Sequence, residues 1–235
     1  MSKYTDIFFD MDDTIWDFSR ASSEALRKVY DNYELSKYFE DFQEFKQIFE
    51  EINKDLWEKY RRNEVQRETV AVVRFIYTLE KKTRDFPLMQ AQRMSDSYLA
   101  YTVEDAYLEP FAHDTIRYLR DKGYRIHIIS DGFFEVQIMK VKMAKIASYV
   151  SHLISAEEVG VLKPDPRIFE YAVNKANTTK EKSIFIGNDY ENDVLGARNA
   201  GLDQVFYNKK KIDVDSLPVK PTYTVQSLKE LWEIF

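Results

Sequence analysis

The sequence contains no cysteine, and this absence excludes disulfide bonds and metal sites built on thiolates. It also contains no apolar run that approaches the roughly 20 residues of a membrane-spanning helix. The first six residues are MSKYTD, which lack the apolar segment of a signal peptide. We therefore expect a cytoplasmic protein that does not engage a membrane.

The sequence also lacks an excess of positive charge. The 235 residues include 34 Lys and Arg against 40 Asp and Glu, which gives a net charge of −6. Sequence-independent binding to a nucleic acid polymer needs a basic surface, so this balance argues against it. The net negative charge does not exclude binding of a small phosphorylated molecule in a locally positive pocket. The three histidines, His113, His127 and His152, lack the spacing of metal ligands, and we expect them to be structural.

Hydrophobic residues make up 44% of the chain, enough for a sizeable core, and their spacing changes along it. Residues 4–10 predict a short buried strand. In residues 17–108, apolar positions recur every three or four residues, which predicts about four helices. This block contains a single proline, Pro87, near a helix start. Four arginines of the block are expected on a solvated helix face: Arg61, Arg62, Arg67 and Arg74.

From residue 109 the pattern alternates between strands and helices. The predicted strands are residues 124–129, 152–155, 183–186, 204–207 and 223–225, and the predicted helices are residues 111–120, 133–146, 165–174, 191–199 and 227–233. Strands separated by helices imply a parallel sheet, which the first strand must join because a lone strand is unstable.

We therefore predict an α/β fold, with a Rossmann-like parallel sheet flanked by helices and an inserted all-helical domain. The core domain would comprise residues 1–16 and 109–235. The helical domain would comprise residues 17–108.

Polar clusters follow four of the predicted strands. They are Asp10 with Asp12, Ser130-Asp131-Gly132, Lys163-Pro164, and the segment from Gly187 to Asp193. The carboxyl ends of parallel strands converge on one crevice, where α/β proteins bind ligands. Two carboxylates two residues apart at such a strand end also suit Mg²⁺, which prefers oxygen ligands.

These four clusters, in this order across nearly the whole chain, resemble the signature motifs of the haloacid dehalogenase (HAD) superfamily. The helical insertion between the first and second clusters resembles the C1-type cap of that superfamily. The stretch from Asp10 to Trp16, the cap pattern and the chain length are also similar to the noncanonical pyrimidine nucleotidases, a 5′-nucleotidase group.

The resemblance implies a role for each carboxylate of the first cluster. Asp10 matches the nucleophile that forms an aspartyl-phosphate. Asp12 matches the general acid and base, and its backbone carbonyl is expected to bind the metal. Dehalogenases proper lack this second aspartate, because halide departure needs no proton. Thr14 is expected to brace the loop that carries the nucleophile.

The second and third clusters match the residues that hold the phosphate. Ser130 is expected to hydrogen-bond a phosphate oxygen, with the backbone N–H groups of Asp131 and Gly132 nearby. Lys163 is expected to stabilise both the nucleophile and the developing negative charge.

The fourth cluster departs from the family pattern, which has Gly-Asp where this chain has Gly187-Asn188. Either Asn188 or Asp189 therefore takes the metal-ligand position, and the spacing to Asp193 favours Asn188. The predicted Mg²⁺ ligands are Asp10, Asp12, Asn188 and Asp189. Asp193 would lie behind them and orient Lys163 or a metal-bound water.

The resemblance implies a Mg²⁺-dependent phosphomonoesterase acting through an aspartyl-phosphate on a small phosphorylated metabolite, first of all a nucleoside 5′-monophosphate. Two alternatives stay open: a β-phosphoglucomutase-like phosphotransferase, and a non-enzymatic phosphate-ligand binding protein on the same scaffold. The expected partner is the small metabolite, with no nucleic acid polymer and no membrane. The chain is expected to be a monomer or a weak homodimer.

Overall fold

The computed structural model describes residues 3–235. The chain divides into two compact units. One unit runs to Phe18 and resumes over Ala106–Phe235, and the other comprises Ser19–Asp105.

The first unit is built on a six-stranded sheet with the strand order β3-β2-β1-β4-β5-β6. The strands are β1 (Asp6–Phe9), β2 (Arg125–Ser130), β3 (Val150–Ser155), β4 (Ser183–Gly187), β5 (Asp203–Tyr207) and β6 (Tyr223–Val225). Every neighbouring pair is parallel. The predicted α/β fold with a parallel sheet is confirmed.

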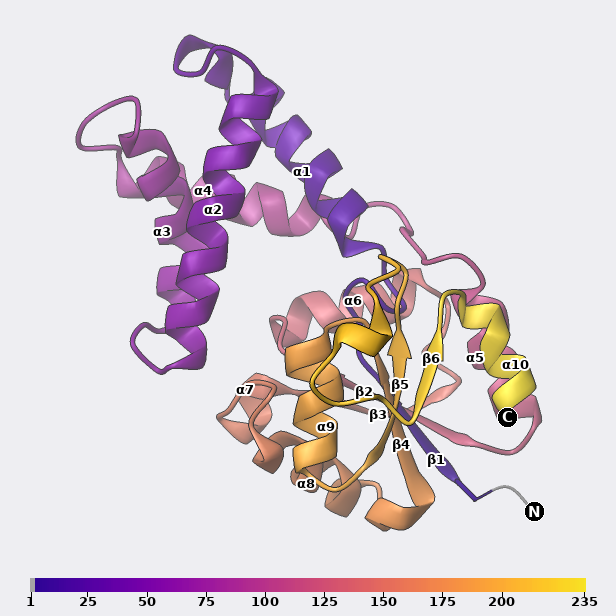
Figure 1. Cartoon of the computed structure of the whole chain (residues 1–235). Coiled ribbons are helices and arrows are strands. Elements are labelled where there is room, and N and C mark those ends of the chain that lie inside the picture. The colour runs from indigo at the N-terminus through magenta and orange to yellow at the C-terminus, as the bar shows by residue number, and fades with distance from the viewer. Residues whose placement is uncertain (1–2) are drawn as a thin grey trace. The chain divides into compact units, whose positions relative to one another are not determined.

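Helices cover both faces of this sheet. They are α5 (Ala112–Asp121), α6 (Phe134–Met143), α7 (Ala156–Val159), α8 (Pro166–Lys175), α9 (Gly196–Asn199) and α10 (Leu231–Ile234). In Figure 1, α5 and α10 lie on one side of the sheet, while α8 and α9 lie on the other. Tyr118 of α5 stacks on Trp232 of α10 with ring centroids 5.2 Å apart, which fixes that layer.

The central strand β1 is apolar on both faces because helices cover both faces of the sheet. Ile7, Phe8 and Phe9 are all buried. Phe9 pairs with Ile128 of β2 on one side and with Ile186 of β4 on the other. The three strands therefore end side by side, and the polar residues that follow them emerge at one edge.

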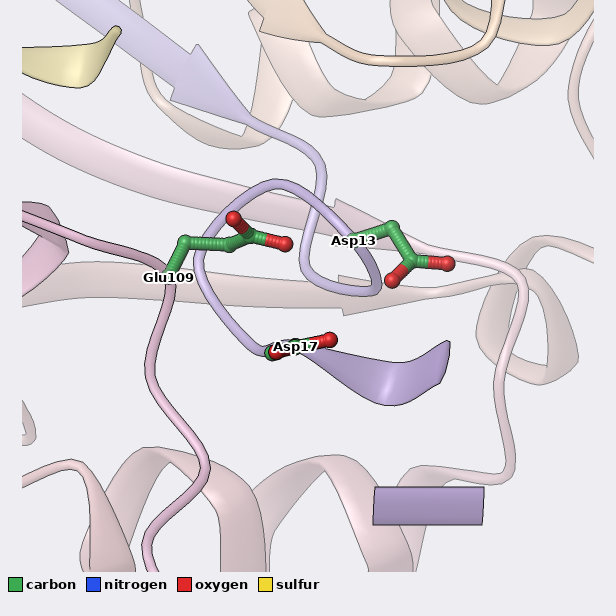
Figure 2. Close-up of side chains that lie close together, drawn as sticks. All are labelled: Asp13, Asp17 and Glu109. Carbon is green, nitrogen blue, oxygen red and sulfur yellow. The ribbon is translucent and has the colours of Figure 1, made fainter. Parts of the chain in front are cut away.

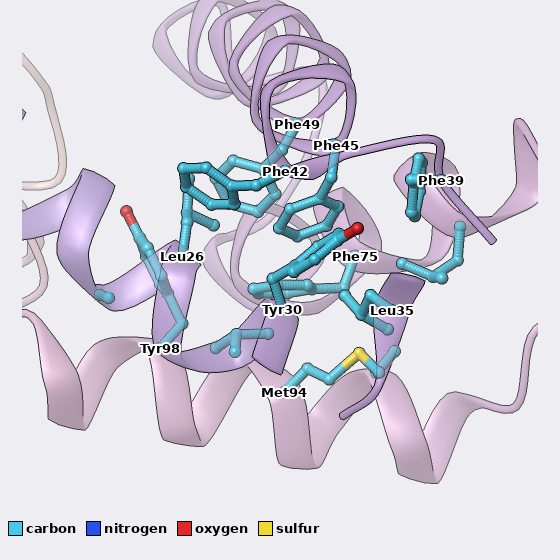
Figure 3. Close-up of a cluster of buried hydrophobic side chains, with 14 of the residues drawn as sticks. Leu26, Tyr30, Leu35, Phe39, Phe42, Phe45, Phe49, Phe75, Met94 and Tyr98 are labelled. Carbon is cyan, nitrogen blue, oxygen red and sulfur yellow. The ribbon is translucent and has the colours of Figure 1, made fainter. Parts of the chain in front are cut away.

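The second unit contains four long helices, as predicted. They are α1 (Phe18–Asn32), α2 (Phe42–Arg61), α3 (Arg67–Glu80) and α4 (Leu88–Tyr101). Figure 3 shows their aromatic core, in which Phe45 and Phe49 pack among Tyr30, Phe75 and Tyr98. Among residues 3–235, no helix is both long enough and apolar enough to cross a membrane.

The start of α2 follows from its cap. The Asp41 side chain accepts a hydrogen bond from the Glu44 backbone N–H at 2.9 Å, so the helix begins at Phe42. Phe39 therefore precedes the helix, although it lies three residues before Phe42, at the spacing of a helix face. Its ring is still buried, 5.2 Å from that of Phe45.

Arg74 contradicts the predicted solvated face. Its side chain is buried, and the guanidinium lies 4.6 Å from the centre of the Tyr98 ring. Nη1 donates to Asn53 Oδ1 at 3.2 Å, and Nε donates to the Ala71 carbonyl at 3.1 Å. Cation–π contacts with the aromatic core stabilise the buried guanidinium. The positions of charged residues along a helix do not indicate such contacts.

The predicted helix over residues 191–199 is divided in the structure. A π-helical segment, η3 (Tyr190–Leu195), precedes the short α9. The Asp189 side chain caps η3 by accepting from the Asn192 N–H at 2.9 Å. The wider turn places Asp193 on the buried side of the segment, where the sheet edge lies.

Candidate active site

The centre of the site is a buried contact between Asp10 and Lys163. Asp10 directly follows β1, and its backbone N–H donates to the Ile186 carbonyl of β4 at 2.8 Å. Lys163 lies in the loop before α8, and its Nζ is 2.5 Å from Asp10 Oδ1. Both side chains are nearly inaccessible to solvent. The structure thus joins the first and third clusters of the sequence.

Asp193 completes a buried group of three charges. Its Oδ1 accepts from Lys163 Nζ at 2.7 Å, and its Oδ2 accepts from the Asp189 backbone N–H at 2.9 Å. Gly187 makes this approach possible, because a Cβ at that position would collide with the Asp193 carboxylate. The predicted contact between Asp193 and Lys163 is present in the structure.

The charges of Asp10, Lys163 and Asp193 shift one another's pKa values. Burial raises the pKa of Asp10 well above its ordinary value, although the Lys163 charge opposes this shift. Burial also raises the pKa of Asp193, again against the effect of Lys163. Burial disfavours the Lys163 ammonium, but the two carboxylates outweigh burial and hold its pKa above the ordinary value. Two buried carboxylates thus share one ammonium, and a cation would offset the remaining negative charge.

Thr14 brings Asp10 and Asn188 together. Its hydroxyl lies 3.2 Å from Asp10 Oδ2 and 3.0 Å from Asn188 Oδ1, so it can donate to either oxygen. The Asp189 carboxylate instead caps η3. Of the two residues that the sequence left open for the metal, Asn188 is the one that shares the Thr14 hydroxyl with Asp10.

The second cluster forms the loop after β2. Ser130 is buried, and its Oγ accepts from the Gly132 backbone N–H at 3.2 Å. The Asp131 Oδ1 accepts from the Lys163 backbone N–H at 2.9 Å. The Asp131 side chain therefore ties the second cluster to the third, a contact between distant segments that the sequence pattern does not indicate.

Asp12 has two partners that the sequence analysis did not single out. Lys140 Nζ donates to Asp12 Oδ1, and Gln137 Nε2 donates to Asp12 Oδ2 at 3.2 Å. Both donors come from α6, where they share a buried face with Val136 and Val141. Two long polar side chains at helical spacing on an otherwise apolar face were the available signal.

Comparison with known proteins places the chain in a family. The model of the haloacid dehalogenase-like hydrolase family matches residues 7–201. The chain belongs to this family. The resemblance predicted from the four clusters is confirmed, as is the prediction of a hydrolytic enzyme.

Two relatives and one solved structure are informative. The chain is 28% identical to pyrimidine 5′-nucleotidase YjjG of Escherichia coli, over 99% of this chain and 98% of the relative. It is 28% identical to a glyceraldehyde 3-phosphate phosphatase of Methanothermobacter thermautotrophicus, over 96% of this chain and 98% of the relative. The crystal structure of the HAD-hydrolase YfnB from Bacillus subtilis bound to magnesium superposes with a TM-score of 0.86 and 24% identity, over 99% of each chain.

In this HAD-like hydrolase, a second acidic group lies near the first cluster. Oxygen atoms of Asp13, Asp17 and Glu109 lie within 4.8 Å of one another (Figure 2). Burial raises the pKa of Glu109, against the effect of Lys209. Lys209 contacts both Glu109 and Asp13, the latter at 3.2 Å, so a cation of the protein already offsets this group.

Glu109 and Lys209 were missed by the sequence analysis. The contact joins residues 100 positions apart, and no local pattern indicates it. Glu109 also accepts from the Tyr207 hydroxyl at 3.1 Å. These contacts connect the loop after β1 to the segments around Glu109 and Lys209. We therefore interpret the group of Asp13, Asp17 and Glu109 as a structural contact between these segments.

Proposed function

We propose that this HAD-like hydrolase is a Mg²⁺-dependent phosphomonoesterase, in which Asp10 accepts the phosphoryl group of a small metabolite and water then releases it. The contact between Lys163 Nζ and Asp10 at 2.5 Å carries the proposal. A carboxylate needs no base to attack phosphorus, but the negative charge of the phosphate must be offset. Lys163 supplies a fixed positive charge at the nucleophile.

The donor set at the end of β1 fits Mg²⁺. Asp10 and Asn188 each have a side-chain oxygen within hydrogen-bond distance of the Thr14 hydroxyl. We propose these two side chains and the backbone carbonyl of Asp12 as the protein ligands of the metal. When bound, the metal would offset charge on the phosphoryl oxygens. Asp189 is left out of this set because its carboxylate caps η3.

Asp12 would carry the proton. It would give a proton to the leaving alkoxide and later take one from the water that hydrolyses the aspartyl-phosphate. Its side chain is 27% exposed, unlike that of the buried Asp10, so water and substrate can reach it. Halide release needs no such residue, and Asp12 therefore favours phosphate ester hydrolysis.

The phosphate oxygens would contact the loop after β2. Ser130 would donate its hydroxyl, and the backbone N–H groups of Asp131 and Gly132 would add further donors. The contact between Asp131 and the Lys163 backbone supports this assignment, because it holds the loop beside the charged group.

A nucleoside 5′-monophosphate is the substrate that we propose first. The support is the match to pyrimidine 5′-nucleotidase YjjG, which extends over 99% of this chain and includes the helical unit. Glyceraldehyde 3-phosphate is the second candidate, because the phosphatase of that name matches at the same identity, 28%. Both are small phosphorylated metabolites.

The test measures inorganic phosphate released from nucleoside monophosphates, sugar phosphates and glyceraldehyde 3-phosphate, with Mg²⁺ or with EDTA. We expect release only with Mg²⁺ and none from the Asp10→Asn variant, which keeps the size of the side chain but loses the nucleophile. Preference for one class of ester identifies the substrate. Absence of release from every ester would contradict the proposal.

A further inference from the structure

The carboxylate of Asp12 is held at both oxygens by one helix. Lys140 Nζ contacts Oδ1, and Gln137 Nε2 donates to Oδ2 at 3.2 Å. The two donors are three residues apart on α6, so they project from the same face toward one target. This arrangement fixes the direction in which the Asp12 carboxyl points.

Lys140 occupies a position that the fold alone does not favour. Its side chain is only 1% exposed, on a helix face where an apolar side chain would avoid desolvating a charge. Its ammonium lies 4.7 Å from the centre of the Phe18 ring, and Asp12 is its ion-pair partner in the described structure. The ion pair with Asp12 offsets the free-energy cost of burying the Lys140 ammonium.

The position of Gln137 is also energetically unfavourable for its side-chain amide. Its Oε1 is buried and has no hydrogen-bond partner among the described residues. Its Nε2 lies where a Cβ on Gly132 would stand, so the amide packs directly on the phosphate-binding loop. The amide is therefore oriented by Asp12 while it touches the loop that we propose binds phosphate.

We propose that Lys140 and Gln137 are positioning residues that aim the Asp12 carboxyl at the leaving-group oxygen, an inference that rests on the proposed function. In that step the Asp10 oxygen forms a bond to phosphorus as the bond from phosphorus to the ester oxygen breaks. Asp12, once it has taken up a proton, passes that proton to the ester oxygen, and the alcohol departs. The hydrolytic water later returns a proton to Asp12.

The test compares two esters that differ in their need for a proton. The alkoxide of a nucleoside 5′-monophosphate requires one to depart, whereas the phenolate of p-nitrophenyl phosphate departs without it. The ratio kcat/KM reports the steps up to leaving-group departure. For Lys140→Met, we expect kcat/KM to fall by about 10²-fold on the nucleotide, the order of a lost general acid, and by no more than about 3-fold on p-nitrophenyl phosphate.

Asp12→Asn serves as the reference and should show the same selective loss. Lys142→Met, an exposed lysine on the same helix, serves as the matched control and should leave both values unchanged. Gln137→Leu removes the second donor and tests the inference independently if Lys140→Met fails to fold. Its nucleotide value should fall more than its p-nitrophenyl phosphate value.

Equal losses on the two esters, or none, in the folded variants would overturn the inference, because a structural role affects both esters alike. That result leaves the proposed phosphatase standing. If the wild-type protein hydrolyses neither ester nor any other, the proposed function itself fails, and the two failures are thus distinguished.

Discussion

Asp10, Asp193 and Lys163 place three charges in the interior of one unit, and each charge costs several kcal/mol to desolvate. Their mutual attraction offsets part of this cost, but one carboxylate remains in excess. A protein selected for stability alone would gain from apolar side chains at these positions. The proposed binding of a cation and a phosphate would account for this group.

Asn188 provides a test of the metal position. Asn188→Asp adds a negative charge beside Asp10, so the Mg²⁺ concentration for half-maximal phosphate release should fall about 10-fold, equivalent to about 1.4 kcal/mol. Asp189→Asn is the matched control and should leave that concentration unchanged, because asparagine still caps η3. A response of Asp189→Asn alone would assign the metal position to Asp189.

At the scale of elements, Asp6 links strands β1 and β2. It is fully buried, and its carboxylate accepts from Arg125 and His127 of β2 at 2.9 Å each, and from Thr178 at 2.8 Å. Burial alone would raise the pKa of Asp6, but the hydrogen bonds, led by that of His127, outweigh burial and hold the pKa below its ordinary value. The ionised carboxylate is therefore part of the sheet.

Asp6→Asn should lower the free energy of unfolding by about 3 kcal/mol at neutral pH, because it disrupts a buried charged network. The folded pKa of Asp6 lies below its unfolded value of about 3.9, so the stabilisation is present above that pH and is lost as the pH falls below it. Urea unfolding across this range should show the gap between wild type and variant narrowing with acid. A gap that stays constant would contradict this account, and the exposed Asp114→Asn serves as the control.

The secondary structure was predictable wherever local pattern decides it. The strand before Asp10 lies where the sequence predicts it, because a short apolar run is typical of a buried strand. The strand Tyr223–Val225 also lies at its predicted residues, although only Val225 in it is buried. The π-helical turn of η3 was not predictable, because the capping contact of Asp189 and the burial of Asp193 set it. Helical spacing alone favours an ordinary α-helix there.

The site was predictable in part for the same reason. The strand ends placed Asp10, Ser130 and Lys163 in one crevice, and the structure brings Asp10 and Lys163 into contact. The partners on α6 and the pair of Glu109 with Lys209 were missed, since their contacts span from 100 to 128 positions. Such contacts depend on the tertiary packing, to which no short motif corresponds.

At the scale of the whole molecule, the chain is two compact units with separate cores. The core of the helical unit is aromatic, and Phe45 lies within it, fully buried, with the Phe39 ring 5.2 Å away and the Tyr30 ring 5.7 Å away. The unit therefore depends on a few large side chains for its stability.

Phe45→Ala should destabilise the helical unit by about 3–5 kcal/mol, because it removes a ring and leaves a cavity. Urea unfolding followed by circular dichroism measures the loss. Tyr77→Ala, in the same unit but 48% exposed, is the control and should cost less than about 1 kcal/mol. Similar losses in the two variants would show that the aromatic cluster does not hold the unit together.

The central claim is that Asp10 carries the phosphoryl group between substrate and water. The most direct measurement is mass spectrometry of the protein quenched in acid during turnover with Mg²⁺ and the preferred ester. We predict a mass gain of one phosphoryl group, confined to the peptide that contains Asp10 and absent from Asp10→Asn. Turnover without that gain, or with the phosphoryl group on another residue, would contradict the account.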